Sequence, residues 1–317
     1  MSYSNYPHGF LGGVTIRGVP LQQLYPGEVI WVNSSSVYSL GGIAGSDVDS
    51  PKRGTYKHPF ATINGAITST KVVASRGDIV AVMPGHTETV SAAAGVALTK
   101  AGVAVIGLGR GSLRPTLNLT ATSSTIALSS ANCAWVNMLI TGGVDAVVSP
   151  VIVSAADCFV ELNYRDVTGQ CTDGLTTTAA ADRLDLVVND YDGATAAGTN
   201  AAVAIVGGDG IKITCKRMDG NFAVGGIDVR TTATTDVLVR DIEYFRTRNA
   251  ADIFIVDTVT GSTGQVGPNC YLRLNDNAAN ITEACTGATF VYHQPISIVN
   301  LAGEVGLNTN ITASTDA

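Results

Sequence analysis

Short runs that alternate hydrophobic and polar residues recur along most of this chain, and most of them end in a polar or glycine-containing turn. Alternation over four to eight residues is typical of a β-strand with one buried face, so each run predicts a strand. The runs are "VIGLG" at 105, "VNMLITG" at 136, "VELNYRDVTG" at 160, "LDLVVNDYDG" at 184, "ITCKRMDG" at 213, "VLVRDIEYF" at 237, "CYLRLNDN" at 270 and "ISIVNLAG" at 296.

The runs start about 27 residues apart, too far for a hairpin and too close for a β-α-β unit. A second apolar run precedes most of them, as in "PVIVSAADCFVELNY", so the repeating unit is strand, turn, strand and longer loop. Such units predict an all-β, right-handed parallel β-helix of about eight rungs, each burying its inward side chains against the next. In "VELNY", Val160, Leu162 and Tyr164 share the predicted inner face.

The six cysteines are interpreted as reduced and mostly buried, because no Cys-x-x-Cys pair suggests zinc or redox chemistry. Cys133 and Cys158 occupy the same place in successive units, with Arg183 next in that column. Small side chains stacked at one corner of a solenoid explain this recurrence without any reactivity. We therefore predict no metal site and no cofactor.

The region before the repeats predicts a cap. Phe60, Ile63, Ala66 and Ile67 recur at helical spacing, and Pro59 suits a first helical turn, so we expect a short helix at about 59–75. The simplest division of the chain is an arm at 1–50 and a β-helix at 51–317. The arm has scattered aromatic anchors but no sustained periodicity; those singled out are Tyr6, Phe10, Tyr25 and Trp31.

The order "GTYKHPFATINGAI", "RGDIVAVMPGHTETVS" and "AGVAVIGLGRGSLRPTL" resembles the entry of single-stranded right-handed β-helix proteins of the pectate-lyase-like superfamily. The resemblance implies a capping helix followed by a Gly-Asp turn that starts the first rung. The first 170 or so residues, including "PHGFLGGVTIRGVPLQQLYPGEVIWV", are also similar to virion structural proteins of tailed bacteriophages. This second likeness carries no catalytic motif, and it implies a role in the particle.

Acidic residues recur six positions after five of the run starts. On a β-helix they would form an acidic ladder along one edge, and paired carboxylates are the equipment of glycoside hydrolysis. Aspartate also ends strands well by accepting a backbone N–H in the turn, and we favour this interpretation. Calcium bridging is a third alternative. The column consists of Asp166, Asp190, Asp219, Glu243 and Asp276.

The formal net charge of −7, with scattered Lys and Arg, argues against nucleic acid as a partner. No apolar run approaches the length of a membrane span, and we expect no export signal. His86 in "MPGHTE" is a candidate base, but no histidine lies beside Ser or Cys in a nucleophile motif, so we expect a polar rim residue. The sequence also matches no catalytic signature of sugar-cleaving β-helix families.

These observations favour a non-enzymatic virion protein, made in the host bacterial cytoplasm and placed on the capsid surface, that decorates or cements the head. The expected partners are the major capsid protein and copies of the chain itself, as a homotrimer held by the arm and the coil. The first alternative is a tail spike or fibre that binds, and with the acidic column cleaves, host surface glycan. The second is a free polysaccharide lyase or hydrolase.

Overall fold

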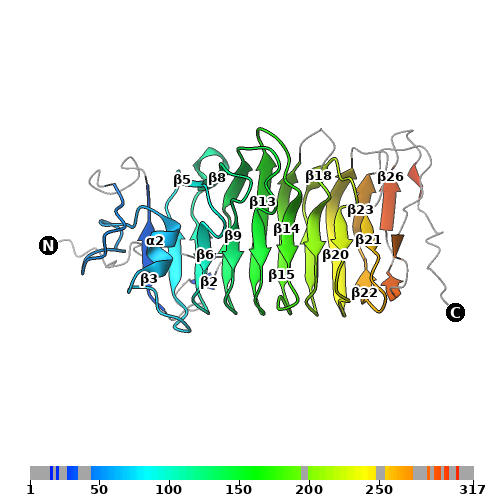
Figure 1. The fold of residues 1–317 in the computed structure, drawn as a ribbon, viewed down its shortest axis with the longest axis horizontal. Coiled ribbons are helices and arrows are strands. Elements are labelled where there is room, and N and C mark those ends of the chain that lie inside the picture. The colour runs from blue at the N-terminus through cyan, green and yellow to red at the C-terminus, as the bar shows by residue number, and fades with distance from the viewer. Residues whose placement is uncertain are drawn as a thin grey trace.

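The computed structural model is an all-β parallel β-solenoid of about seven turns, close to the number of rungs predicted (Figure 1). It describes residues 27–34, 44–193, 199–247, 254–273 and 289–293, together with the backbone of five more short strands. Along the axis the strands follow chain order from blue to red, so each rung contacts mainly the rungs before and after it. This arrangement confirms the predicted fold class.

Each complete turn contributes strand segments to three columns rather than to the two predicted. The first two columns belong to one 17-stranded sheet, because β13, β15 and β20 run through both of them. The first column consists of β3 (Val29–Val32), β4 (Ile79–Val82), β7 (Ala104–Gly107), β10 (Ala134–Val136), β13 (Phe159–Asp166), β15 (Asp185–Asp192), β17 (Lys212–Cys215), β20 (Val237–Thr247), β22 (Thr263–Val266) and β25 (Thr289–Tyr292).

The second column continues around the corner of the same sheet, and the third forms a separate eight-stranded sheet. The second consists of β5 (Thr87–Val90), β8 (Thr116–Leu119), β11 (Leu139–Gly142), the ends of β13, β15 and β20, β18 (Met218–Gly220), β23 (Cys270–Arg273), β26 (Ile296–Val299) and the antiparallel β27 (Val305–Gly306). The third consists of β6 (Val96–Leu98), β9 (Ile126–Leu128), β12 (Val151–Val153), β14 (Asp173–Thr177), β16 (Ala201–Ile205), β19 (Ile227–Val229), β21 (Ile255–Asp257) and β24 (Ala284–Cys285). An antiparallel pair, β1 (Thr15–Ile16) and β2 (Val19–Pro20), lies outside these sheets.

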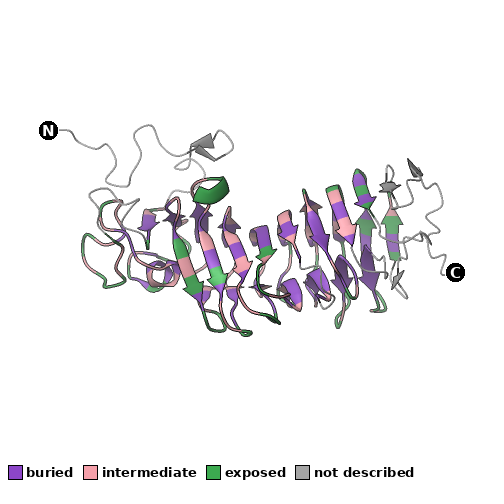
Figure 2. Ribbon diagram, turned by 90° about the horizontal axis from the view of Figure 1, so that it is seen from above, coloured by how far each residue is buried: buried purple, intermediate pink, exposed green. Residues whose placement is uncertain are grey.

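The inner face follows the predicted alternation. Val160 pairs with Leu186 in the next rung, and Leu162 pairs with Val188. Figure 2 shows buried residues along the facing rows of strands. Aromatic rings also stack inside the solenoid, and the ring centroids of Tyr164 and Tyr191 lie 5.4 Å apart. The stack continues through Phe222, Phe245 and Phe254.

One corner of the solenoid uses a left-handed backbone conformation in rung after rung. The residue there donates its N–H to the following rung, to a backbone carbonyl in six rungs and to the Thr263 hydroxyl in the seventh, so the turns stack as regularly as the strands. Gly, Asn and Asp tolerate positive φ better than other residues, which accounts for most members of this corner column. Its members are Ser75, Gly102, Asn132, Asp157, Arg183, Gly210 and Asp236.

The corner column corrects one predicted alignment. Cys133 and Cys158 are neighbours in successive rungs and are both buried, as predicted. Arg183, however, aligns with Asp157 rather than with Cys158, and its guanidinium binds the Asp157 carboxylate at 2.6 and 2.7 Å. The predicted column therefore slips by one residue at this rung.

The predicted capping helix exists but is shorter than 59–75: α2 spans Ile63–Thr68. Thr62 is its N-cap, with a side-chain oxygen that accepts from the Gly65 N–H, and Pro59 lies outside the helix. Ile63, Ala66 and Ile67 are buried in the main core. Figure 1 shows α2 at the N-terminal end of the coil, where it covers the first rungs.

The Gly-Asp turn before the first long rung is a hydrogen-bonding centre. The buried Asp78 carboxylate accepts from the backbone N–H groups of Glu28 and Val73, and the Arg76 guanidinium binds it at 2.7 Å. Burial alone would raise the pKa of Asp78, but these hydrogen bonds outweigh it and hold the pKa below its usual value. Asp78 thus ties the strand before the helix to the strand after it.

A second hydrophobic cluster lies outside the solenoid, on the outer face of β3, β4, β7 and β10. Trp31 is 1% exposed there and packs edge-on against Tyr56, with ring centroids 5.0 Å apart. We call this set the outer cluster; its buried members are Trp31, Ile79, Ala81, Met83, Ala104, Ile106 and Ala134. It gives the N-terminal rungs an apolar layer on both sides of the sheet.

Candidate functional site

The acidic column predicted from the sequence does not form a ladder. The run starts at 184 and 237 are two residues out of register, because Val160 pairs with Leu186 and Ile213 pairs with Val239. Register shifts between Leu162 and Asn163, and again within β20, add to this displacement. A β-bulge inserts a residue into one strand only, so a fixed offset no longer marks a fixed position. As a result the predicted acids lie in different places, and Asp276 falls outside the described residues.

Three of these acids have neighbours that define their roles. Asp166 lies on the inner side, where its carboxylate accepts from the Tyr164 hydroxyl. Asp190 pairs across rungs with Asn163, and Asp219 pairs with Asp192. Glu243 is exposed at the irregularity in β20. Asp190 and Asp219 lie near each other, since both contact Arg217. Asp166 and Glu243 do not join them.

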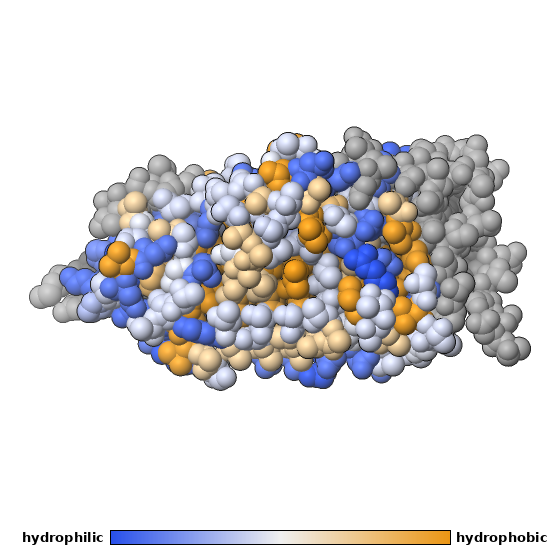
Figure 3. Space-filling model, in the orientation of Figure 1, coloured by the Kyte–Doolittle hydropathy of each residue, from blue (hydrophilic) through white to orange (hydrophobic). Residues whose placement is uncertain are grey.

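What the structure assembles instead is a mixed charged row on the outer face of the second column. Arg165 pairs in register with Asp192, Asp192 with Asp219, Asp219 with Arg246, and Arg246 with Arg273. Successive members lie about 4.8 Å apart at the backbone. On the face drawn in Figure 3, the densest hydrophilic patch lies over the C-terminal rungs, beside smaller apolar patches.

Arg217 holds the acids of this charged row together. Its guanidinium lies 2.8 Å from Asp190, 3.4 Å from Asp192 and 3.3 Å from Asp219. Burial alone would lower the pKa of Arg217, but its hydrogen bond to Asp190 and the nearby carboxylates raise it. These acids are thus engaged by a cation, whereas a general acid needs a carboxyl group whose proton is retained near neutral pH. The arrangement supports a structural or binding role better than acid–base catalysis.

A second charged cluster, which sequence inspection missed, lies on the third column. Arg230 bridges Asp173 and Asp228, and both carboxylates are almost completely buried. Burial raises the pKa of Asp173 and of Asp228, with Arg230 opposing it. The partners lie up to 57 residues apart in the sequence, so only knowledge of rung spacing could have revealed the cluster.

His86 is buried, not a rim residue, and it joins the cap to the first rungs. Its Nδ1 accepts from the Ser34 backbone N–H at 2.9 Å, so its Nε2 carries the proton directed at Glu88, 3.2 Å away. Glu88 also accepts from the Ile63 N–H at the start of α2. The Ser34 hydroxyl donates to the Thr87 carbonyl instead of to His86, so this trio is not a nucleophile with its base.

Of the predicted arm residues, only Trp31 is described. It lies in β3, which pairs with β4 along its whole length, so the solenoid begins inside the predicted arm at 1–50. The four-residue pattern "VIWV" is too short to stand out alone. Its partner strand begins 50 residues later, so the regular spacing of the repeats does not reveal it either. Tyr6, Phe10 and Tyr25 lie outside the described residues.

The cysteines described are all free and buried, in keeping with the predicted reduced state. Burial raises the pKa of Cys133 and Cys270 to about 11 and that of Cys171 to about 12. Within the described ranges, no three His, Cys, Asp or Glu side chains are placed to hold a metal ion. The described helices also include none long and apolar enough to cross a membrane.

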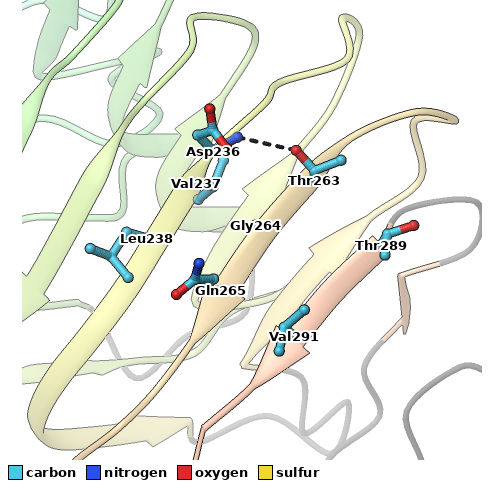
Figure 4. A pocket seen from close by; sticks show the side chains of 8 residues that line it. All are labelled: Asp236, Val237, Leu238, Thr263, Gly264, Gln265, Thr289 and Val291. Carbon is cyan, nitrogen blue, oxygen red and sulfur yellow. Dashed lines mark hydrogen bonds between the residues drawn. The ribbon is translucent and has the colours of Figure 1, made fainter.

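A half-open pocket of about 430 Å³ lies on the outer face of the last rungs of the first column (Figure 4). Thr263 accepts from the Asp236 N–H at its rim, and Leu238, Gln265 and the exposed Val291 form its floor. Asp236 is its only ionisable lining residue among those described. Its chemistry suits weak, uncharged contacts.

Comparison with known proteins found no matching family model, no matching curated protein and no matching solved structure.

Proposed function

We propose that the protein is a structural component of a bacteriophage virion, a decoration or cement protein that stabilises the capsid. The observation that carries the proposal is the state of the candidate catalytic acids: Asp190 and Asp219 contact Arg217, and Asp166 contacts Tyr164. A continuous inner core whose candidate acids are engaged by neighbouring side chains suits a rigid part of a particle. The pattern of the first 170 or so residues, which resembles that of virion structural proteins, implies the same role.

In this role the major capsid protein and further copies of the chain, as a homotrimer, are the partners. The test is cosedimentation of the purified protein with DNA-filled heads that lack tails, with light scattering to count subunits. We expect saturable binding of trimers and heads that resist heat longer. Binding to tails but not to heads would contradict the proposal.

The second candidate is a tail spike or fibre that binds host surface polysaccharide. The observation in its favour is that Tyr271 is 57% exposed on the strand that ends the charged row at Arg273. Of the predicted column Asp166, Asp190, Asp219 and Glu243, its cleaving version would use Asp190 and Asp219, the two acids that lie near each other. Release of reducing sugar from capsular polysaccharide or lipopolysaccharide, abolished by Asp190→Asn but retained by Asp185→Asn, would support this candidate over the first.

A further inference from the structure

We infer that the C-terminal end of the charged row is a binding site for an acidic saccharide, a sugar ring that bears a carboxylate or a phosphate. The inference holds wherever the protein sits in a particle, so it goes beyond the decoration role. It rests on the charges and rings that the last described rungs bring to one face.

The first step is an excess of positive charge. Arg246 and Arg273 are cross-strand neighbours, so two guanidinium groups extend from adjacent rungs about 4.8 Å apart. Like charges placed directly opposite each other destabilise a sheet. Arg246 has one described carboxylate nearby, Asp219 at 3.9 Å, which lies closer to Arg217 at 3.3 Å. Arg273 makes no ion pair with any described residue.

The second step is the kind of anion that fits. Two neighbouring guanidinium groups match the planar or tetrahedral oxygens of a carboxylate or phosphate, and each can donate two hydrogen bonds. Arg246 is partly buried and Arg273 is exposed, so an anion can reach both from solvent. This geometry selects a single compact acidic group.

The third step is the aromatic surface beside the arginines. Tyr271 precedes Arg273 by two residues on the same outer face, which places the two side chains roughly 6.6 Å apart at the backbone. Buried Cys270 and Leu272 alternate with them and confirm which face each residue occupies. A flat, exposed ring at this distance suits a sugar ring whose acidic substituent reaches the arginines, since aromatic rings pair an apolar face with a polar tip.

The opposing charges set the limits of the site. Glu243 lies on the neighbouring strand β20, near Tyr271, where the pairing of β20 with β23 is irregular. Asp219 lies on the other side of Arg246, 3.3 Å from Arg217. With the overall charge of −7, these acids disfavour a long polyanion such as nucleic acid. A short acidic saccharide touches only the Arg246, Arg273 and Tyr271 surface.

Isothermal titration of the full chain with trigalacturonate, glucose 6-phosphate, maltotriose and inorganic phosphate tests the inference. We expect trigalacturonate or glucose 6-phosphate to bind at least tenfold more tightly than maltotriose and phosphate; the better of the two identifies the acidic group. Equal binding of maltotriose, equal binding of phosphate alone, or binding of none at millimolar concentration would overturn it.

Variants sharpen the test. Arg273→Gln removes a cation with no described ion pair, so we expect a folded protein with at least tenfold weaker binding. Tyr271→Ala should weaken binding similarly, whereas Tyr271→Phe keeps the ring and should stay within about twofold. Arg110→Gln is the matched control, because Arg110 is exposed in the loop after β7. An equal loss with Arg110→Gln would mean that only net charge matters, and would overturn the site.

Discussion

The outward-facing column of the first sheet differs sharply between the two halves of the solenoid, although the inward-facing column does not. In the N-terminal half it reads Val29, Ile79, Ala104, Ala134 and Phe159. Across the next rungs it continues as Asp185, Lys212, Leu238, Gln265 and Val291. Inner packing thus determines the coil, while the outer face changes freely from an apolar layer to a mixed and more exposed one.

The largest effect expected from this contrast is at Trp31. Trp31→Ala removes a fully buried ring from the outer cluster and should lower the free energy of unfolding by about 3–5 kcal/mol in urea titrations. Leu238→Ala, at an outward position of the polar half, should cost about 1 kcal/mol or less. Equal losses would show that the two halves do not differ in the way the burial indicates.

Next is Asp78, which anchors the N-terminal half. Asp78→Asn leaves the Arg76 cation and a backbone donor without their acceptor and should cost about 2–3 kcal/mol near neutral pH. Because the folded pKa of Asp78 lies below its ordinary value of 3.8, its contribution is full above that value. It is lost as the pH falls through the folded pKa. Melting temperatures of the two proteins should therefore converge in acid, and a constant gap would contradict this.

In the polar half, the charged row should contribute less. Arg217→Gln breaks three ion pairs and should cost about 1 kcal/mol, because solvent screens the pairs with the partly exposed Asp190 and Asp192, and Arg246 remains near the buried Asp219. The loss should shrink in 1 M salt, where exposed charges interact over only about 3 Å. Arg53→Gln, an arginine that bonds backbone carbonyls in the N-terminal half, should lack this salt dependence. A salt-insensitive loss at Arg217 would mean that packing, not charge, is responsible.

The smallest effect tests the claim that the inner face is the same in both halves. Cys133 and Cys270 lie towards opposite ends of the coil, and burial raises the pKa of both thiols to about 11. Neither should react with a thiol reagent at pH 8 in the native protein, since the thiolate is the reactive form. Cys133→Ser and Cys270→Ser should leave the native labelling of the chain unchanged. Rapid labelling at one end only would show that this end opens locally.

Sequence alone predicted the inner face well, because alternation reports burial directly. It placed "VELNY" beside "LDLVV", and these runs are adjacent, although Val160 pairs with Leu186, two residues beyond the predicted start at Leu184, which keeps the same face inward. The predicted alignment of the repeats is wrong after residue 237, because "CYLRLNDN" pairs with the second half of β20 and not with its start. The strand that pairs with that start, β22, reads "TGQV" and lacks the alternation, since Gly264 leaves room for the ring of Phe290.

The candidate site was less predictable, because it depends on bulges and on contacts between rungs. The bulge at Asn189 of β15 moves Asp190 opposite Asn163, which no count from the rung start could show. Arg217 was not singled out, although it lies between two of the predicted acids in space. An outward arginine among recurring acids is the signal that could have found it.

The corner column has a consequence for how such chains change in length. The N–H of each left-handed residue donates to the adjacent turn, and Gly, Asn, Asp, Ser and Arg all occur there. Excision or tandem duplication of one whole coil, from one corner to the next, would rejoin equivalent ends. The solenoid would then be shorter or longer by about 4.8 Å for each coil removed or added, with the N-terminal cap unchanged.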